Sequence, residues 1–315
     1  MVNAGNSIHV STKSGKLEGK RENRQFVFKG VPYAAPPVGK LRWHPPHGVQ
    51  PWEGIRPAGD FGPIAPQNVL PGSEMIAGLG VDEPRNEDCL FLNIWTPGID
   101  DVRRPVMVWI HGGAFIIGSG SQDMFRNHTL VDRCDVVLVT INYRLGALGF
   151  MNLNEITGGK IPATGCEGLL DQIAAVNWVR ENIINFGGDP DNITLFGESA
   201  GAMSICNIMS MPVAQGSFHK AILESGGANT VCLPEEAVSA AASFCRILNI
   251  KPDDADALYS LTVDQIMHAQ QCLGDVMREK DGRITPFQPV VDGAVLPELP
   301  IYAIRRGAAS GIPTL

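Results

Sequence analysis

The stretch Gly197-Glu198-Ser199-Ala200-Gly201 decides the fold of this chain. The run 192–197 that leads into it is apolar and β-branched, which predicts a strand, and 200–211 predicts a helix. A G-x-S-x-G sequence between a strand and a helix is typical of a sharp turn that exposes the serine hydroxyl at the carboxyl edge of a sheet. The two glycines let strand and helix approach closely, and the N–H groups at the start of the helix favour negative charge beside Ser199.

The sequence on both sides of this turn alternates strand-like apolar runs with helical patterns. We expect further strands at 89–96, 106–110, 136–142 and 218–224, and helices at 168–186, 234–248 and 261–273. This alternation predicts an α/β fold with a mainly parallel central sheet covered by helices. Nearer the N-terminus, the runs 8–11, 17–20 and 25–31 predict antiparallel strands that begin as a hairpin around Ser14-Gly15.

The remaining segments are less regular. Residues 31–84 are rich in Pro and Gly, which predicts long connections, and we expect substrate-contacting residues in the stretch Asn68 to Asp82. Residues 308–315 have the pattern of a loop that enters a strand, so the chain ends within its architecture. We therefore expect residues 1–315 to be the N-terminal portion of a single domain that is truncated at its C-terminus.

A second glycine motif, Trp109-Ile110-His111-Gly112-Gly113-Ala114-Phe115, follows the predicted strand 106–110. Ester hydrolysis passes through a tetrahedral oxyanion that preorganised backbone N–H groups stabilise, and small residues leave such groups uncovered. An H-G-G loop supplies half of the oxyanion hole in enzymes that use a G-x-S-x-G serine. Either motif alone is weak, but the two together, in this order, predict a serine nucleophile with an oxyanion hole.

Composition excludes several classes of protein. The 315 residues are 44% hydrophobic, enough to fill a large core, which excludes a disordered or fibrous chain. The net charge of −8 disfavours a nucleic-acid surface, and the basic residues between Lys13 and Arg24 alternate with Glu18 and Glu22 as in a solvated hairpin. The sequence has neither an apolar run of 18 residues nor an N-terminal signal pattern, so we expect no association with membranes. Its seven cysteines, an odd number without C-x-x-C spacing, argue against a disulfide framework or a zinc site and favour a reducing compartment.

On these motifs the chain resembles the type-B carboxylesterase and cholinesterase family of the α/β-hydrolase fold, and within it the bacterial para-nitrobenzyl esterases. The matching stretches run in order through nearly the whole chain: 28–34, 41–43, 87–94, 109–115, 142–146, 168–172, 186–190, 196–201 and 224–226. A set of this length is far more specific than one motif. The resemblance implies an α/β-hydrolase with N-terminal antiparallel strands that hydrolyses carboxylic esters.

The resemblance also assigns roles residue by residue. Ser199 matches the nucleophile, and the backbone N–H groups of Gly113, Ala114 and Ala200 match the oxyanion hole. Ser225 matches a hydroxyl that supports the catalytic acid.

Three further side chains have expected supporting roles. Arg42 and Glu87 match a structural ion pair of the family. From its position, His111 is expected to orient the oxyanion loop. Glu198, beside the nucleophile, is expected to lie near the catalytic groups without reacting itself.

The chain departs from the family pattern at a cysteine. In secreted relatives the cysteine that matches Cys89 pairs with one upstream, and Ala65 occupies that partner position here. The resemblance therefore implies that Cys89 is a free, buried thiol.

A larger departure concerns the catalytic acid and base. The family order is Ser, then Asp or Glu, then His, and only His219 and His268 follow Ser199. His219 precedes the strand 218–224, whose far end is the catalytic edge, and about six residues at roughly 3.3 Å each place it about 20 Å away. His268 lies in a predicted helix among glutamines and is expected at the surface. The resemblance places both the acid and the base beyond Leu315.

These observations lead to one hypothesis and two alternatives. The chain is predicted to be a cytoplasmic serine carboxylesterase that forms an acyl-enzyme on Ser199, needs no cofactor or metal, and acts on a small-molecule ester. A companion segment would supply the catalytic Glu and His. The alternatives are a catalytically silent binding module of the same fold, and an N-terminal fragment that is inactive until complemented.

Overall fold

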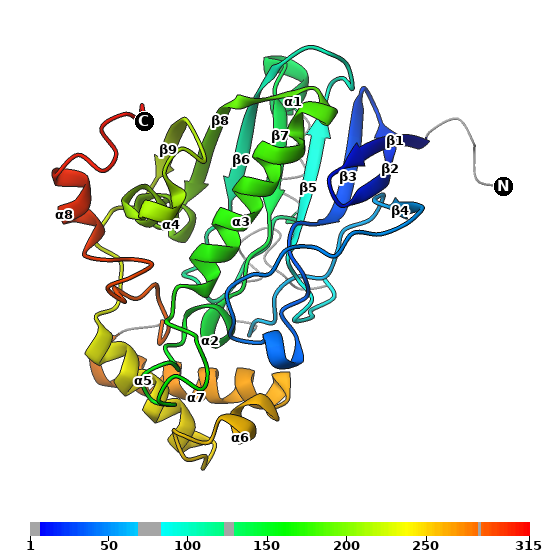
Figure 1. Cartoon of the computed structure of the whole chain (residues 1–315). Helices are drawn as coiled ribbons and strands as arrows, with labels where there is room; N and C mark the ends of the chain where they lie inside the picture. The colour runs from blue at the N-terminus through cyan, green and yellow to red at the C-terminus, as the bar shows by residue number, and fades with distance from the viewer. Residues whose placement is uncertain (1–6, 69–82, 123–128, 283–284) are drawn as a thin grey trace.

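The computed structural model describes residues 7–68, 83–122, 129–282 and 285–315. Its centre is a 9-stranded sheet with the strand order β1-β2-β3-β5-β7-β6-β8-β9, and β4 pairs with β2 beside this path (Figure 1). The strands are β1 (Ser7–Thr12), β2 (Gly15–Glu22), β3 (Gln25–Pro32), β4 (Ile55–Pro57), β5 (Phe91–Thr96), β6 (Arg104–Ile110), β7 (Val137–Ile141), β8 (Gly188–Glu198) and β9 (Lys220–Glu224).

The sheet is mixed. Strands β7, β6, β8 and β9 are parallel neighbours, whereas β1, β2 and β3 form the expected antiparallel N-terminal part. Strand β5 runs antiparallel to both β3 and β7. The apolar run 89–96 could not reveal this direction, because a strand that is buried on both faces has the same apolar sequence pattern whichever way it runs. The predicted α/β architecture is confirmed, with a larger antiparallel share than a mainly parallel sheet implies.

The helices lie on both faces of the sheet and at its carboxyl edge (Figure 1). Helices α3 and α4 pack on β8, α8 packs on α4, and α1 contacts β7. The α-helices are α1 (Thr129–Cys134), α2 (Gly146–Phe150), α3 (Glu167–Asn182), α4 (Ala200–Ser210), α5 (Pro234–Ile247), α6 (Ala255–Tyr259), α7 (Val263–Asp281) and α8 (Pro300–Arg305). Short 3-10 turns lie at η1 (Gly39–Leu41), η4 (Ile183–Phe186) and η5 (Pro212–Ala214).

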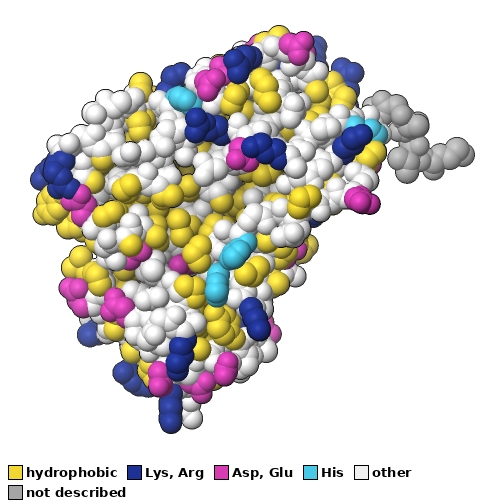
Figure 2. Space-filling model, in the orientation of Figure 1, with side chains coloured by type: hydrophobic (Ala, Val, Ile, Leu, Met, Phe, Trp, Pro, Cys, Tyr) yellow, Lys and Arg dark blue, Asp and Glu magenta, His cyan; other side chains and the backbone are white. Residues whose placement is uncertain are grey.

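The main core lies between the sheet and helices α3 and α4. Alternate residues of the parallel strands, such as Val108 and Leu195, point into it, and both are fully buried. A smaller cluster, formed by Val27, Trp95, Val131 and Leu138, lies on the opposite face beneath α1. In Figure 2, hydrophobic side chains spread across the middle of one face, with charged side chains of both signs around them.

Both ends of the described chain agree with the predicted pattern. The N-terminal hairpin is solvated, with Lys20 paired to Asp60 at 3.0 Å. At the other end, the N–H of Leu315 donates to the carbonyl of Ala221 at 3.0 Å, so the last residues pair with β9 as the expected strand entry. Helix α7 extends beyond the predicted residue 273 and ends before Gly282, whose left-handed φ of 77° closes it. Within the described ranges, no helix has the length and apolarity that crossing a membrane requires.

Candidate active site

The turn at Ser199 has the strained geometry that the G-x-S-x-G pattern predicts. Strand β8 ends at Glu198 and α4 begins at Ala200, which leaves Ser199 with φ 53° and ψ −120°. A Cβ atom on Gly201 would overlap the carbonyl oxygen of Ile110, so only glycine lets α4 start this close to β6. The N–H of Ser199 donates to the carbonyl of Glu224 at 2.8 Å, which fixes the turn to the end of β9.

The glycine loop after β6 is equally constrained. Gly113, Ala114 and Phe115 have positive φ values of 109°, 55° and 63°. The carbonyl of Gly113 accepts hydrogen bonds from the N–H groups of Ile116 and Ile117, both at 3.0 Å. Among the described residues, no group accepts a hydrogen bond from the N–H of Gly113 or of Ala114. The N–H of Ala200 has no intrahelical acceptor because it is the first residue of α4.

The structure brings this loop against the serine turn. A Cβ atom on Gly112 would lie 3.3 Å from the Cβ of Ser199 and 2.9 Å from a carboxylate oxygen of Glu198. The N–H groups of Gly113, Ala114 and Ala200, which donate no hydrogen bond among the described residues, therefore lie on two segments that meet at Ser199. Such an arrangement can stabilise negative charge that develops on a substrate bound to Ser199.

His111, at the start of the glycine loop, holds the loop by ring stacking and a hydrogen bond. Its ring is fully buried and stacks on Tyr143, with ring centroids 4.3 Å apart, and burial lowers the pKa of His111 to about 4. The neutral ring bonds the carbonyl of Gly112 through Nδ1 at 2.8 Å, and the hydroxyl of Tyr143 donates to the carbonyl of His111 at 2.8 Å. The ring of His111 is therefore uncharged at neutral pH and donates from Nδ1 to the carbonyl of Gly112.

The other predicted supporting residues lie at the same edge. Glu198 and Glu224 are exposed and occupy paired positions at the ends of β8 and β9. Ser225 follows directly, with φ 55° and an exposed side chain. A Cβ atom on the next residue, Gly226, would lie 2.8 Å from the carbonyl oxygen of Ser199, so the turn after β9 packs on the serine turn.

Among the described residues, neither of the two histidines that follow Ser199 forms a hydrogen bond with it. His219 precedes β9 at the amino edge, where its Nδ1 accepts a hydrogen bond from the N–H of Ile193 at 3.1 Å. His268 is exposed on α7, with its Nε2 3.6 Å from the sulfur of Cys272. Both positions agree with the sequence expectation, and that neither residue is the base for Ser199 stays a prediction.

Two ion pairs fasten the segments around the edge. The predicted pair between Arg42 and Glu87 is bidentate, at 2.6 and 2.7 Å, and Arg42 also donates to the carbonyl of Leu261 at 2.7 Å. Sequence reasoning did not find the pairing of Arg144 with Asp171, which is bidentate and almost fully buried. Asp171 also accepts the N–H of Arg144 at 3.0 Å, which anchors the chain after β7 to α3.

A second buried carboxylate lies at the start of α3. Glu167 accepts hydrogen bonds from the N–H groups of Thr164 and Gly165, each at 3.0 Å. Burial raises the pKa of Glu167 to about 7, and the positive charge of Arg144 opposes this shift. The apolar residues around Glu167 in the sequence did not indicate a buried acid.

Cys89 is a free, fully buried thiol, as the resemblance implied, and Ala65 is buried at 2% exposure. Burial raises the pKa of Cys89 well above its usual range. The other cysteines are also free. Within the described ranges, no cluster of three or more His, Cys, Asp or Glu residues is able to hold a metal ion. The expected substrate-contacting stretch Asn68 to Asp82 lies outside the described residues except for Asn68.

Sequence reasoning also missed Gln67. This side chain is buried, and its amide bonds both backbone groups of Gly118, at the far end of the glycine loop. A lone glutamine in a Pro-rich stretch gives no signal, because its partner is 51 positions away.

Known proteins are similar to this chain over most of its length. The model of the carboxylesterase family matches residues 6–315. The para-nitrobenzyl esterase of Bacillus subtilis (strain 168) is 43% identical over 307 residues, which cover 97% of this chain and 61% of that protein. The phenmedipham hydrolase of Pseudarthrobacter oxydans is 41% identical over 301 residues, covering 93% of this chain and 58% of that protein.

Solved structures give the same result. A thermophilic para-nitrobenzyl esterase superposes with a TM-score of 0.90 at 42% identity, covering 97% of this chain and 62% of its own. A carboxylesterase of Geobacillus stearothermophilus superposes with a TM-score of 0.86 at 43% identity, covering 97% of this chain and 61% of its own. The chain thus spans about three fifths of the length of the relatives that it matches.

Proposed function

Because the chain belongs to the carboxylesterase family, we propose that it is the part of a serine carboxylic-ester hydrolase that carries the nucleophile and the oxyanion hole. Ser199 attacks the acyl carbon of a small-molecule ester, and the alcohol leaves. Water then releases the acid from the acyl-enzyme. The observation that supports this proposal best is the contact of Gly112 with Ser199, which gathers the hydroxyl and the uncommitted N–H groups.

Each site residue has a proposed role in this reaction. The N–H groups of Gly113, Ala114 and Ala200 receive the oxyanion, and removing one such donor typically costs about 10²–10³ in rate. His111 orients the loop as a neutral donor to Gly112.

The remaining groups act from outside the reacting atoms. Glu198 adds negative charge beside the base, and Ser225 supports the catalytic acid. We infer that the acid and the base come from beyond residue 315, because His219 bonds Ile193 at the amino edge and His268 is exposed on α7 beside Cys272. We also propose a reducing, cytoplasmic location, in which the free cysteines stay reduced.

Covalent labelling tests the nucleophile. In the complete protein that carries this sequence, a fluorophosphonate is expected to label Ser199 alone, and Ser199→Ala is expected to abolish labelling. Peptide mapping by mass spectrometry reads the result. Label on Ser204 or Ser225 would contradict the assignment, and absence of label would favour a silent binding module.

Hydrolysis of para-nitrophenyl acetate tests the missing base. Residues 1–315 alone are expected to show at most the residual activity of a triad without its base. Relative to an intact enzyme, that loss is about 10⁶ in turnover, and the rate that remains is about 10³–10⁴ above the uncatalysed reaction in water. Full turnover by a verified single chain, abolished by His268→Ala or His219→Ala, would place the base within this sequence instead.

A further inference from the structure

Gln67 uses all of its side-chain hydrogen-bonding groups on the glycine loop and its surroundings. Its Oε1 accepts the N–H of Gly118 at 2.8 Å, and its Nε2 donates to the carbonyl of Gly118 at 3.1 Å. The same Nε2 also donates to the carbonyl of Ala65 at 3.0 Å. With 4% of Gln67 exposed, water cannot replace these bonds without opening the loop.

Gly118 is the residue through which Gln67 acts on the loop. Its φ is 113°, and a Cβ atom there would overlap the ring of His111. Gly118 therefore packs directly on the residue that begins the loop and bonds Gly112. The two ends of the loop meet at His111, so a shift of Gly118 displaces the N–H groups of Gly113 and Ala114 between them.

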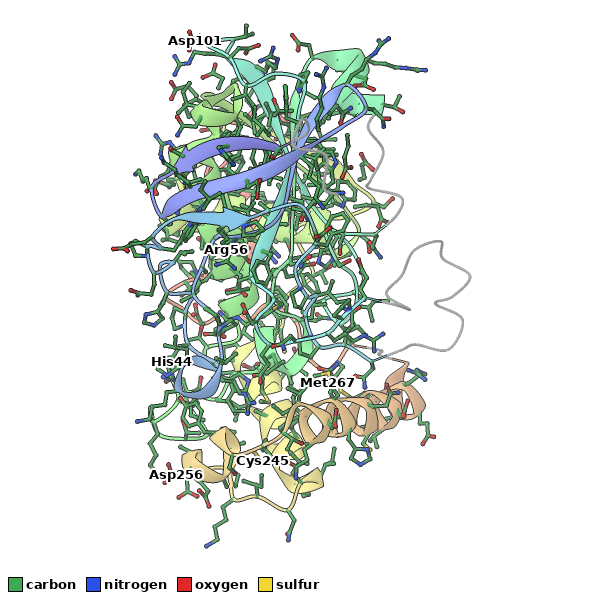
Figure 3. All side chains as sticks on the ribbon, turned by 90° about the vertical axis from the view of Figure 1, so that its right-hand side faces the viewer. His44, Arg56, Asp101, Cys245, Asp256 and Met267 are labelled. Carbon is green, nitrogen blue, oxygen red and sulfur yellow. The ribbon has the colours of Figure 1, made fainter. Side chains whose placement is uncertain are left out.

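The next residue, Asn68, makes matching bonds to the helical layer. Its Nδ2 donates to the carbonyl of Met267 at 3.1 Å, and its Oδ1 accepts from Nε2 of Gln270 at 2.9 Å. Oε1 of Gln270 in turn accepts the N–H of Ala147 at 2.8 Å. Adjacent side chains thus tie α7 to one side and the glycine loop to the other, and Figure 3 shows where Met267 lies at the start of α7.

We propose that Gln67 is a positioning residue that holds the oxyanion donors of Gly113 and Ala114 in place and, through Asn68, couples them to α7. This inference rests on the proposed function of the loop. Gln67 does not touch the reacting atoms, so its removal is expected to weaken stabilisation of the oxyanion more than binding of the substrate.

Gln67→Met removes the amide while keeping the length of the side chain. In the complete protein we expect kcat for para-nitrophenyl acetate to fall by about 10- to 100-fold, less than the loss of a donor itself, while KM changes by less than about threefold. Gln25→Met is the matched control, because Gln25 is equally buried but bonds Asp132 at the amino edge. It is expected to leave kcat unchanged.

Gln67→Glu provides a rescue experiment. A protonated carboxyl can donate to the Gly118 carbonyl and accept from its N–H, as the amide does, whereas a carboxylate cannot donate. The ratio of kcat in Gln67→Glu to that in the unsubstituted protein is therefore expected to rise as the pH falls from 8 to 5. The same ratio for Gln67→Met is expected to stay constant.

Hydrogen exchange separates this proposal from the proposed function. In residues 1–315, Gln67→Met is expected to speed amide exchange in peptides covering 112–118, with no change in α3. If no ester is hydrolysed but this exchange increases, the enzymatic function fails and the coupling stands. Unchanged exchange, or an unchanged kcat in an active enzyme, would overturn the positioning role.

Discussion

The two edges of the parallel strands are built from different residues. At the carboxyl edge, left-handed backbone is adopted by residue types that rarely accept it: Ala114, Phe115, Ser199 and Ser225. At the amino edge the same conformation falls on Asp135 before β7 and Gly187 before β8, which adopt it readily. Strained non-glycine positions cost about 1–3 kcal/mol each and persist only where the surrounding structure fixes them. The fold therefore concentrates strain where the N–H groups and the hydroxyl converge.

The ion pairs at the two edges differ in how far their side chains are exposed to solvent. At the amino edge Arg104 pairs with Asp100 and Asp135, whose side chains are 46% and 68% exposed. At the carboxyl edge Arg144 and Asp171 are 3% and 0% exposed. Asp101, in the amino-edge loop, and Met267 lie toward opposite ends of the molecule in Figure 3. Breaking the buried pair is therefore expected to cost more stability than breaking an exposed one.

The largest effect is expected at Gly201. Gly201→Ala places a methyl group on the carbonyl of Ile110, a backbone atom that cannot move aside, so we expect a loss of about 3 kcal/mol or more. Urea unfolding measures it. Gly48→Ala, where nothing lies within 4 Å, is the control and is expected to change stability by less than about 1 kcal/mol. Equal losses in the two variants would remove the steric basis of the turn.

The next effect concerns Glu167, whose folded pKa of about 7 exceeds its unfolded value of 4.5. Because the folded state holds the proton more tightly, the stability that Glu167 contributes is fully present below pH 4.5 and is lost as the pH rises to about 7, by about 3 kcal/mol. Glu167→Gln is expected to remove this slope in unfolding experiments across that range. A slope that persists unchanged in Glu167→Gln would show that another group causes it.

The pKa of Asp100 moves the other way. The hydrogen bond from Arg104 lowers it, so the stability it contributes is present above its unfolded pKa and is lost as the pH falls. The contribution of Asp100 thus depends on pH with the opposite sign to that of Glu167.

A smaller effect tests the strain itself. Ser199→Gly removes the Cβ atom at φ 53° and is expected to raise stability by about 1 kcal/mol while abolishing reaction. Ser199→Ala removes the hydroxyl but keeps the Cβ atom, so it should gain nothing. Thermal unfolding of the two variants side by side measures the difference. Identical midpoints would mean that the turn is not strained.

The smallest effect is expected at the amino edge. Asp100→Asn leaves Arg104 paired with Asp135 at 2.7 Å, so we expect a loss of no more than about 0.5 kcal/mol at neutral pH. Urea unfolding at low and high salt measures it. A loss as large as that of Gly201→Ala would erase the contrast between the edges.

Much of this arrangement could be predicted from local patterns. The strand and helix around Ser199, the loop after Ile110 and the hairpin at Ser14-Gly15 each depend on neighbours within a few positions, so the sequence contains their cause. Helix α2 was missed because Gly146–Phe150 is short and contains two glycines, which weaken any helical signal.

What could not be predicted depends on distant partners. The role of Gln67 depends on its hydrogen bonds to Gly118, and the role of Asp171 depends on its ion pair with Arg144. The direction of β5 follows from its neighbours in the sheet and not from its own residues. The raised pKa of Glu167 results from burial by residues elsewhere in the chain.

The hydrogen bonds that join the loops around Arg42 and Asn68 to the region of α6 and α7 form late during synthesis of the chain. Arg42 bonds Leu261 across 219 positions, and Asn68 bonds Gln270 across 202. A ribosome adding about 5–20 residues per second needs about 10–40 s to make the later partner after the earlier one. Throughout that interval the early loops of the nascent chain lack their hydrogen-bond partners at Leu261, between α6 and α7, and at Gln270 on α7. The carboxyl-edge loops around Arg42 and Asn68 therefore gain these bonds only after residue 270 has been synthesised, and slow translation before residue 261 lengthens the time for which they are exposed to proteases and chaperones.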